Sequence, residues 1–292
     1  MITIEKVVVT GMGAITSIGN SADEYFSNLI KGKCGIKKIT RIPTDEIETV
    51  YAAEVDGEFE TLVKKYWNKR QLNPTTQAVR LVLATAGEAV DNCGIDFETC
   101  DRNRVGVIYG VVTNSFFPEI ENTSSHIILK DMPSACSALI SMKYNLHGAS
   151  FNLSSACSSS GYAISIAAQL IESGLYDVVI AGGVSSLVSY PMVKGFNQLL
   201  AMSTNEDMTK TCRPFTKNRD GFIMGEGAGT LILESESHAR KRNANIICNL
   251  SGYGMFSESS NLTAPMADGE GMKESMRLAL EKANMTADDI DY

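Results

Sequence analysis

The chain has 292 residues, of which 44% are apolar and 21% charged, the ordinary balance of a folded globular protein. Acidic residues exceed basic ones by 34 to 26, and the formal net charge of −8 argues against a general nucleic-acid binder. No apolar run reaches the roughly 20 residues of a membrane span, and the first residues predict a strand instead of a signal peptide. Seven cysteines without CxxC spacing indicate free thiols in a cytoplasmic protein, with no disulfide framework and no metal site.

Strand-like and helix-like patterns alternate along the chain. Apolar, β-branched runs predict strands at 6–11, 104–109, 151–156, 176–183 and 229–234. Helical spacing predicts helices at 21–30, 77–90, 158–173 and 237–242, the first of them with Ser21 as its N-cap. This alternation predicts an α/β fold in layers, with a mostly parallel or mixed sheet.

The pattern restarts near residue 245. Residues 245–254 again predict a strand that runs into glycines, as residues 6–13 do, and a helix is expected at about 271–283. We therefore expect a duplicated architecture, with an N-terminal half at 1–245 and the start of a second half at 246–292.

Other motifs carry little functional signal. Gly11–Thr16 follows a strand but lacks the third glycine of a dinucleotide-binding loop, so a tight packing turn is the favoured interpretation. The three histidines, His126, His147 and His238, lie in expected loops or on a basic helix. A surface or structural role is favoured for each of them over that of a general base.

The segment Ser154–Gly161 carries the strongest functional signal. A strand is expected to turn there into a helix, which leaves Cys157 at or near the helix N-terminus. The helix dipole and free backbone N–H groups favour a thiolate at that position, and small neighbouring residues would let a substrate carbonyl approach. From this spacing alone, a catalytic nucleophile and a buried structural cysteine are about equally good interpretations.

Four segments taken together form a more specific signal. They are Val7–Gly19, Ala156–Ser160, Ala181–Gly183 and Arg213–Gly229. With them the chain resembles, nearly end to end, the β-ketoacyl-acyl carrier protein synthases, the elongating condensing enzymes of the thiolase fold. The resemblance implies a thiolase-like fold of duplicated mixed-sheet α/β halves in layers, with the second half truncated. It also implies Cys157 as the acyl-accepting nucleophile, Phe196 as a gatekeeping aromatic beside it and Thr113 in the acyl tunnel.

The reaction implied by the resemblance is a decarboxylative Claisen condensation in fatty-acid or polyketide chain elongation, with no cofactor held by the protein. A growing acyl chain moves from the phosphopantetheine of an acyl carrier protein to Cys157. A malonyl-acyl carrier protein then loses CO₂, and its carbanion attacks the thioester. Two alternatives stay open: a cysteine acyltransferase or thioesterase-like homologue, and a non-catalytic chain-length-type partner subunit. Subunits of that last kind usually replace the cysteine.

The resemblance also implies two partners, an acyl carrier protein and a second chain of the ketosynthase or chain-length type. Because carrier proteins are acidic, we expect one to dock on the basic residues Lys64, Lys65, Lys69 and Arg70. The alternative interpretation is that these residues only form a solvated helix face. Family members form homodimers or heterodimers. The strand at 176–182, which would otherwise be an exposed edge, is expected to pair with its equivalent in the partner.

Some family elements do not occur in this sequence. The family uses histidines from an H-G-T segment and a later G-H segment, and the three histidines up to Tyr292 match neither. We therefore expect this chain by itself to lack the catalytic histidines and not to carry out condensation, a longer chain or a partner supplying the rest. Thr216 replaces a family aspartate and Leu200 an arginine, which leaves room for a specialised or polyketide-type synthase.

Overall fold

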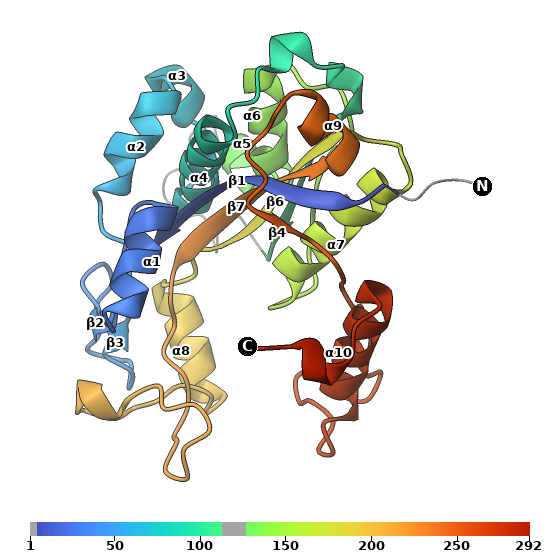
Figure 1. The fold of residues 1–292 in the computed structure, drawn as a ribbon. Helices are drawn as coiled ribbons and strands as arrows, with labels where there is room; N and C mark the ends of the chain where they lie inside the picture. The colour runs from blue at the N-terminus through green and yellow to red at the C-terminus, as the bar shows by residue number, and fades with distance from the viewer. Residues whose placement is uncertain (1–4, 113–126) are drawn as a thin grey trace.

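The computed structural model describes residues 5–112 and 127–292, and in them a six-stranded mixed sheet forms the centre of the fold (Figure 1). The strand order is β5-β4-β6-β7-β1-β8. The strands are β1 (Val7–Thr16), β4 (Val105–Val111), β5 (Ser150–Leu153), β6 (Val178–Ser185), β7 (Gly227–Ser235) and β8 (Cys248–Asn249). A separate hairpin pairs β2 (Lys37–Lys38) with β3 (Tyr51–Ala52). β4 is parallel to β5 and β6, and the remaining pairs in the sheet are antiparallel.

Helices cover both faces of this sheet. The α-helices of the described residues are α1 (Ala22–Ile30), α2 (Phe59–Tyr66), α3 (Lys69–Leu72), α4 (Gln77–Cys93), α5 (Ile127–Asp131), α6 (Ala135–Tyr144), α7 (Ser159–Glu172), α8 (Tyr190–Gln198), α9 (Glu236–Lys241) and α10 (Glu270–Ala283). Val178 and Ile180 of β6 join the core that contains α4, whereas Val179 and Ala181 join the core that contains α7. Because strand side chains alternate between faces, α4 and α7 lie on opposite sides of the sheet. No helix in the described part of the chain is long and apolar enough to cross a membrane.

The glycines near the start of the chain lie within β1, which continues to Thr16, so the expected tight turn at Gly11 is wrong. A Cβ atom on Gly11 would lie 2.3 Å from the carbonyl oxygen of Ala89, and one on Gly13 would lie 2.1 Å from that of Thr85. Both carbonyls belong to α4. Glycine is therefore required here by the close packing of α4 on the strand, and not by a change of chain direction.

The restart near residue 245 repeats this packing. A Cβ atom on Gly252 would lie 2.2 Å from the Ala279 carbonyl oxygen, and one on Gly254 would lie 1.9 Å from that of Ser275 on α10. In both copies, two glycines with one residue between them meet helix carbonyls four residues apart. The strand itself is short, since β8 covers two residues and joins β1 at the edge of the first sheet, while α10 stands apart from the layers (Figure 1). The boundary at 245 and 246 stays a prediction.

The strand expected to mediate dimerisation does not lie at an edge. β6 is hydrogen-bonded to β4 on one side and to β7 on the other, so no second chain can pair with it. Its apolar run Val178–Ala181 is buried because it lies in the middle of the sheet, and the prediction for 176–182 is therefore wrong. The edge strands within the described residues are β5 and β8.

Candidate active site at Cys157

Cys157 is exposed in the turn between β5 and α7, one residue before the helix N-cap, Ser158. Ala156 has a φ of 46°, in the left-handed region that a residue with a Cβ adopts at a cost. Serines hold this turn, because the N–H of Ser155 donates to Ser159 Oγ at 2.8 Å and Ser159 Oγ donates to the Ala156 carbonyl at 2.6 Å. The turn thus presents the thiol at the start of a 14-residue helix, as predicted.

Two glycines set where that helix begins. Gly110 of β4 and Gly183 of β6 are paired residues on adjacent parallel strands. A Cβ atom on Gly110 would lie 2.2 Å from the carbonyl carbon of Ser159, and one on Gly183 would lie 2.5 Å from the Cβ of Ser160. The first turn of α7 therefore rests directly on the sheet. This contact fixes the position of Cys157 immediately before it.

The thiol opens into a cavity of about 600 Å³. Its lining is formed by Thr16, Gly110, Val112, Ala156, Cys157, Ser159, Ser160, Gly183, Val184, Ser185, Leu187, Met192, Phe196 and Gly227–Gly229. Phe196 on α8 thus shares the cavity with Cys157, as the resemblance implied, and its ring packs edge-to-face on Phe222 with centroids 5.4 Å apart. Thr113, the expected tunnel residue, lies outside the described residues.

The lining offers hydroxyl groups but no titratable partner for the thiol. Among the described residues around the cavity there is no histidine, lysine or carboxylate. His147 is exposed, and Nδ1 of His238 lies 2.5 Å from Oε1 of Glu234, at the other end of β7 from the lining residues Gly227–Gly229. His126 lies outside the described residues.

Ion pairs brace the sheet end beside this cavity. Glu226, next to the lining residue Gly227, pairs with Arg41 and accepts hydrogen bonds from the Val55 N–H at 3.2 Å and Gln77 Nε2 at 3.2 Å. Arg41 also pairs with the buried Glu54 at 3.2 Å. Burial alone would raise the pKa of Glu54, but hydrogen bonds from Thr40 and Arg41 outweigh it, and the pKa is lowered. Both carboxylates therefore act as fixed anchors of the chain around the site.

The four expected docking residues are exposed on α2 and α3, and none lines the cavity. Lys65 Nζ donates to Asp91 Oδ2 at 2.8 Å and to the Tyr66 hydroxyl at 3.0 Å, and these hydrogen bonds raise the pKa of Lys65. Within residues 5–112 and 127–292, Lys64, Lys69 and Arg70 make no ion pair. The free positive charge of this surface therefore comes from those three residues.

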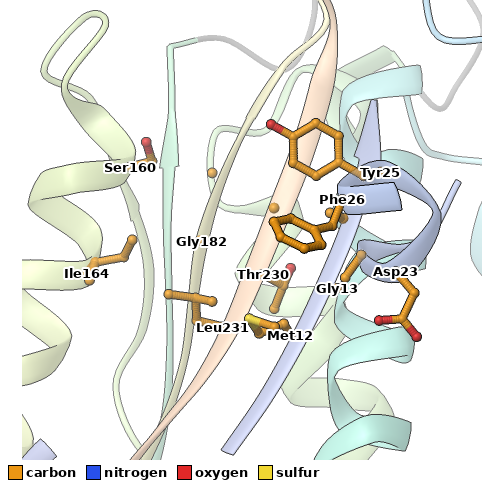
Figure 2. A pocket seen from close by; sticks show the side chains of 14 residues that line it. Met12, Gly13, Asp23, Tyr25, Phe26, Ser160, Ile164, Gly182, Thr230 and Leu231 are labelled. Atoms are coloured by element: carbon orange, nitrogen blue, oxygen red, sulfur yellow. The ribbon is translucent and has the colours of Figure 1, made fainter. Parts of the chain in front are cut away.

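A second, mostly apolar cavity of about 600 Å³ adjoins the first. Figure 2 shows Tyr25 and Phe26 of α1 on one side of it and Ser160 and Ile164 of α7 on the other, with the strands between them. The two cavities share Ser160, Gly183 and Gly229. Cys157 lines the first cavity, and no cysteine is among the described residues that line the second.

Comparison with known proteins assigns this arrangement to a family. The family model described as "Beta-ketoacyl synthase, N-terminal domain" matches residues 4–239. The chain belongs to this family. A β-ketoacyl synthase relative, the 3-oxoacyl-[acyl-carrier-protein] synthase 2 of Staphylococcus aureus (strain COL), is 31% identical over 300 residues, which cover 99% of this chain and 72% of the relative.

Solved β-ketoacyl synthase structures share the fold. A β-ketoacyl synthase from Burkholderia phymatum STM815 superposes with a TM-score of 0.88 at 31% identity, covering 99% of this chain and 72% of that one. The ishigamide ketosynthase/chain length factor gives a TM-score of 0.88 at 28% identity, with the same coverage. The thiolase-like fold expected from the sequence is thereby confirmed.

Sequence reasoning missed two supports of this site. One is the pair Gly110 and Gly183, although an isolated glycine within an apolar strand is itself a signal of close backbone approach. The other is α8, which carries Phe196. Its signals were Ser189 at the N-cap position and Pro191 in the first turn.

Proposed function

We propose that the protein is a condensing enzyme that makes 3-oxoacyl thioesters, with Cys157 as the residue that carries the acyl chain. The observation that supports this most directly is the exposed thiol at the start of α7, in a cavity that also holds Phe196. Family membership supports the reaction class, and the geometry supports the choice of residue. The protein supplies no cofactor, since the acyl groups arrive as reactive thioesters on the phosphopantetheine of acyl carrier protein.

In the first step, Sγ of Cys157 attacks the carbonyl carbon of the acyl thioester. The bond from carbonyl carbon to Cys157 sulfur forms, the bond to the phosphopantetheine sulfur breaks, and that thiol leaves with the proton. The N–H of Cys157, in the turn before α7, is the donor that we propose for the oxyanion of the tetrahedral intermediate. The acyl chain then lies along the apolar lining at Leu187, Met192 and Phe196.

In the second step, the malonyl group of a second carrier protein loses CO₂, and the electron pair left on its α-carbon attacks the Cys157 thioester. A carbon–carbon bond forms, and the Cys157 thiolate leaves. Enolate formation calls for hydrogen-bond donors at the malonyl thioester oxygen. The resemblance assigns this task to two histidines, and the described residues that line the cavity include none.

Lys64, Lys69 and Arg70 are the residues we propose to meet the acidic carrier protein, because Lys65 is already paired with Asp91. For a second ketosynthase-type chain, we propose β5 as the pairing strand. Val107 N–H donates to the Ala149 carbonyl at 2.8 Å, so alternate residues of β5 face β4. Ser150 and Asn152 then direct their backbone groups outward, where no described strand meets them.

The test is transfer of a radiolabelled acyl chain from acyl carrier protein to the protein, followed by addition of malonyl-acyl carrier protein. Wild type and the control Cys34→Ala, which lacks another exposed thiol, are expected to retain label, and to release a 3-oxoacyl product once a chain that supplies the two family histidines is present. Cys157→Ala is expected to lose loading by roughly 10⁴-fold or more. Label lost as free acid without a new carbon–carbon bond would indicate a thioesterase-like enzyme, and no loading of wild type would indicate a partner subunit.

A further inference from the structure

The inference concerns Asn197, the residue after Phe196 on α8. Its side chain is buried, with 7% of the residue exposed, although its neighbours Phe196 and Gln198 are less buried. A buried amide in a helix needs hydrogen-bond partners, and a helix whose role was only to fill space would place an apolar residue there. The position therefore indicates a specific contact.

That contact is with Thr49, in the segment between β2 and β3. Asn197 Oδ1 accepts the N–H groups of Glu48 at 3.1 Å and Thr49 at 3.2 Å, and Nδ2 donates to Thr49 Oγ1 at 2.7 Å. Thr49 Oγ1 in turn donates to the Ser203 carbonyl at 2.8 Å. Thr49 and Ser203 are each 1% exposed, so the chain of hydrogen bonds is shielded from water.

Apolar packing surrounds these hydrogen bonds. Ile39, Ile47 and Ala52 from the β2–β3 segment form one buried cluster with Val188, Val193, Met202 and Met224, and Phe196 packs against this cluster. The apolar contacts hold α8 against the segment without fixing its rotation, because they are not directional. The hydrogen bonds of the Asn197 amide are directional, so they fix the rotation of α8 about its axis and its position along that axis.

We propose that Asn197 and Thr49 are a positioning pair that sets where Phe196 stands in the Cys157 cavity, and hence the chain length that the cavity accepts. Successive helix residues are about 100° apart, so an Asn197 side chain held toward Thr49 leaves Phe196 turned toward the cavity. The proposal rests on the proposed function only in calling the occupant an acyl chain. A change in the pair shifts α8 and with it the wall that Phe196 forms.

The test uses Thr49→Val, which removes the hydroxyl at nearly constant shape, and Thr49→Ser, which keeps it. The probes are N-methyl and N-octyl iodoacetamide, whose rates of alkylation at Cys157 are measured by peptide mass. In Thr49→Val, the ratio of octyl to methyl rates is expected to change by roughly tenfold, the effect of a small change in an apolar pocket. Thr49→Ser is expected to keep the wild-type ratio within about twofold.

A matched control separates positioning from lost stability. Thr85→Val removes another buried hydroxyl, which lies 2.8 Å from Thr230 Oγ1 between α4 and β7. It is expected to lower the melting temperature without changing the alkylation ratio. If Thr49→Val fails to fold, Asn197→Asp repeats the test. It keeps the oxygen that accepts the Glu48 and Thr49 N–H groups but loses the N–H that donates to Thr49 Oγ1. The proposal is overturned if Thr49→Val or Asn197→Asp leaves the octyl-to-methyl ratio at the wild-type value, as Thr85→Val is expected to do.

The same probes keep this inference apart from the proposed function. Alkylation needs an accessible thiol and a cavity but no acyl transfer. Wild-type protein that is alkylated with a chain-length preference, yet takes no acyl chain from carrier protein, would contradict the proposed function alone. Loss of the preference in Thr49→Val would still support the positioning pair.

Discussion

Gly110 and Gly183 lie opposite each other on β4 and β6, and the first turn of α7 rests on both. Neither position has room for a Cβ atom, because Ser159 and Ser160 already occupy that space. The position of the thiol therefore depends on two glycines that are 47 and 26 residues away from Cys157 in the sequence. A methyl group at either site would lift the helix from the sheet.

Gly110→Ala is expected to lower the rate of acyl loading at Cys157 by roughly tenfold or more, since misplacement by about 1 Å has large effects on catalysis. It should also cost roughly 1–3 kcal/mol of stability through overpacking. The control is Gly161→Ala in α7, where an added Cβ meets nothing within 4 Å. Loading by Gly110→Ala at the rate of Gly161→Ala would contradict this role of the glycine.

The double variant Lys69→Ala/Arg70→Ala is expected to raise KM for acyl-carrier-protein substrates, with a larger effect at low salt, because exposed charges act mainly by steering. Lys65→Ala should have a smaller effect, since Asp91 already balances that charge. Loading from an acyl N-acetylcysteamine thioester, which has no carrier protein, is the control and should not change. A double variant that still loads normally from carrier protein at low salt would rule out this surface.

Ser150→Pro is expected to convert a dimer to a monomer in sedimentation experiments. Proline at this outward-facing position of β5 removes one N–H from the free edge and leaves the hydrogen bonds to β4 in place. Its melting temperature, measured at low protein concentration, should stay near that of wild type under the same conditions. A Ser150→Pro protein that remains a dimer would place the interface elsewhere.

Stability should depend on Glu234, which is buried in β7 and paired with Arg242 at 2.8 Å. Burial opposes its charge, but hydrogen bonds from Arg242, His238 and Thr10 lower the pKa of Glu234 from 4.5 to about 2. A lowered folded-state pKa contributes stability above the unfolded value. That contribution, roughly 3 kcal/mol, is therefore complete above pH 4.5 and lost as the pH falls to about 2.

Glu234→Gln is the corresponding test by chemical denaturation. At pH 7 it should lower the free energy of unfolding by roughly 3–5 kcal/mol, because the half-buried Arg242 is left without a partner charge. The difference from wild type should shrink as the pH falls below 4.5. Glu236→Gln, which removes an exposed pair with Arg240 on the adjoining helix, should change stability little. A pH-independent difference would show that the Glu234 charge does not matter.

Local patterns predicted most of the sheet and the larger helices. The N-cap of α1 is a clear case, since Ser21 Oγ accepts the Glu24 N–H at 3.1 Å as its position suggests. The order of the strands was not predictable in this way. β6 has the apolar composition of any buried strand, and composition does not distinguish a central strand from an edge that a partner covers.

At the site, the sequence predicted the turn and the thiol but not their supports. Cys157 was found from a strand-to-helix junction, which is a local feature. Asn197 and Thr49 are 148 residues apart, and nothing in the local pattern of either residue indicates the other. Phe196 was placed by family resemblance alone, because the helix that carries it has only nine residues and contains both a proline and a glycine.

The central claim is that the acyl chain is carried on Cys157. Peptide mapping after incubation with acyl carrier protein that bears an acyl chain tests it most directly. We expect one acyl adduct per chain, on the peptide that contains Cys157, with Cys34, Cys212 and Cys248 unmodified although they too are exposed. Malonyl-acyl carrier protein, added with a chain that supplies the two family histidines, should then remove the adduct as a chain two carbons longer. An adduct on another cysteine, or equal loading of Cys157→Ala, would contradict the account.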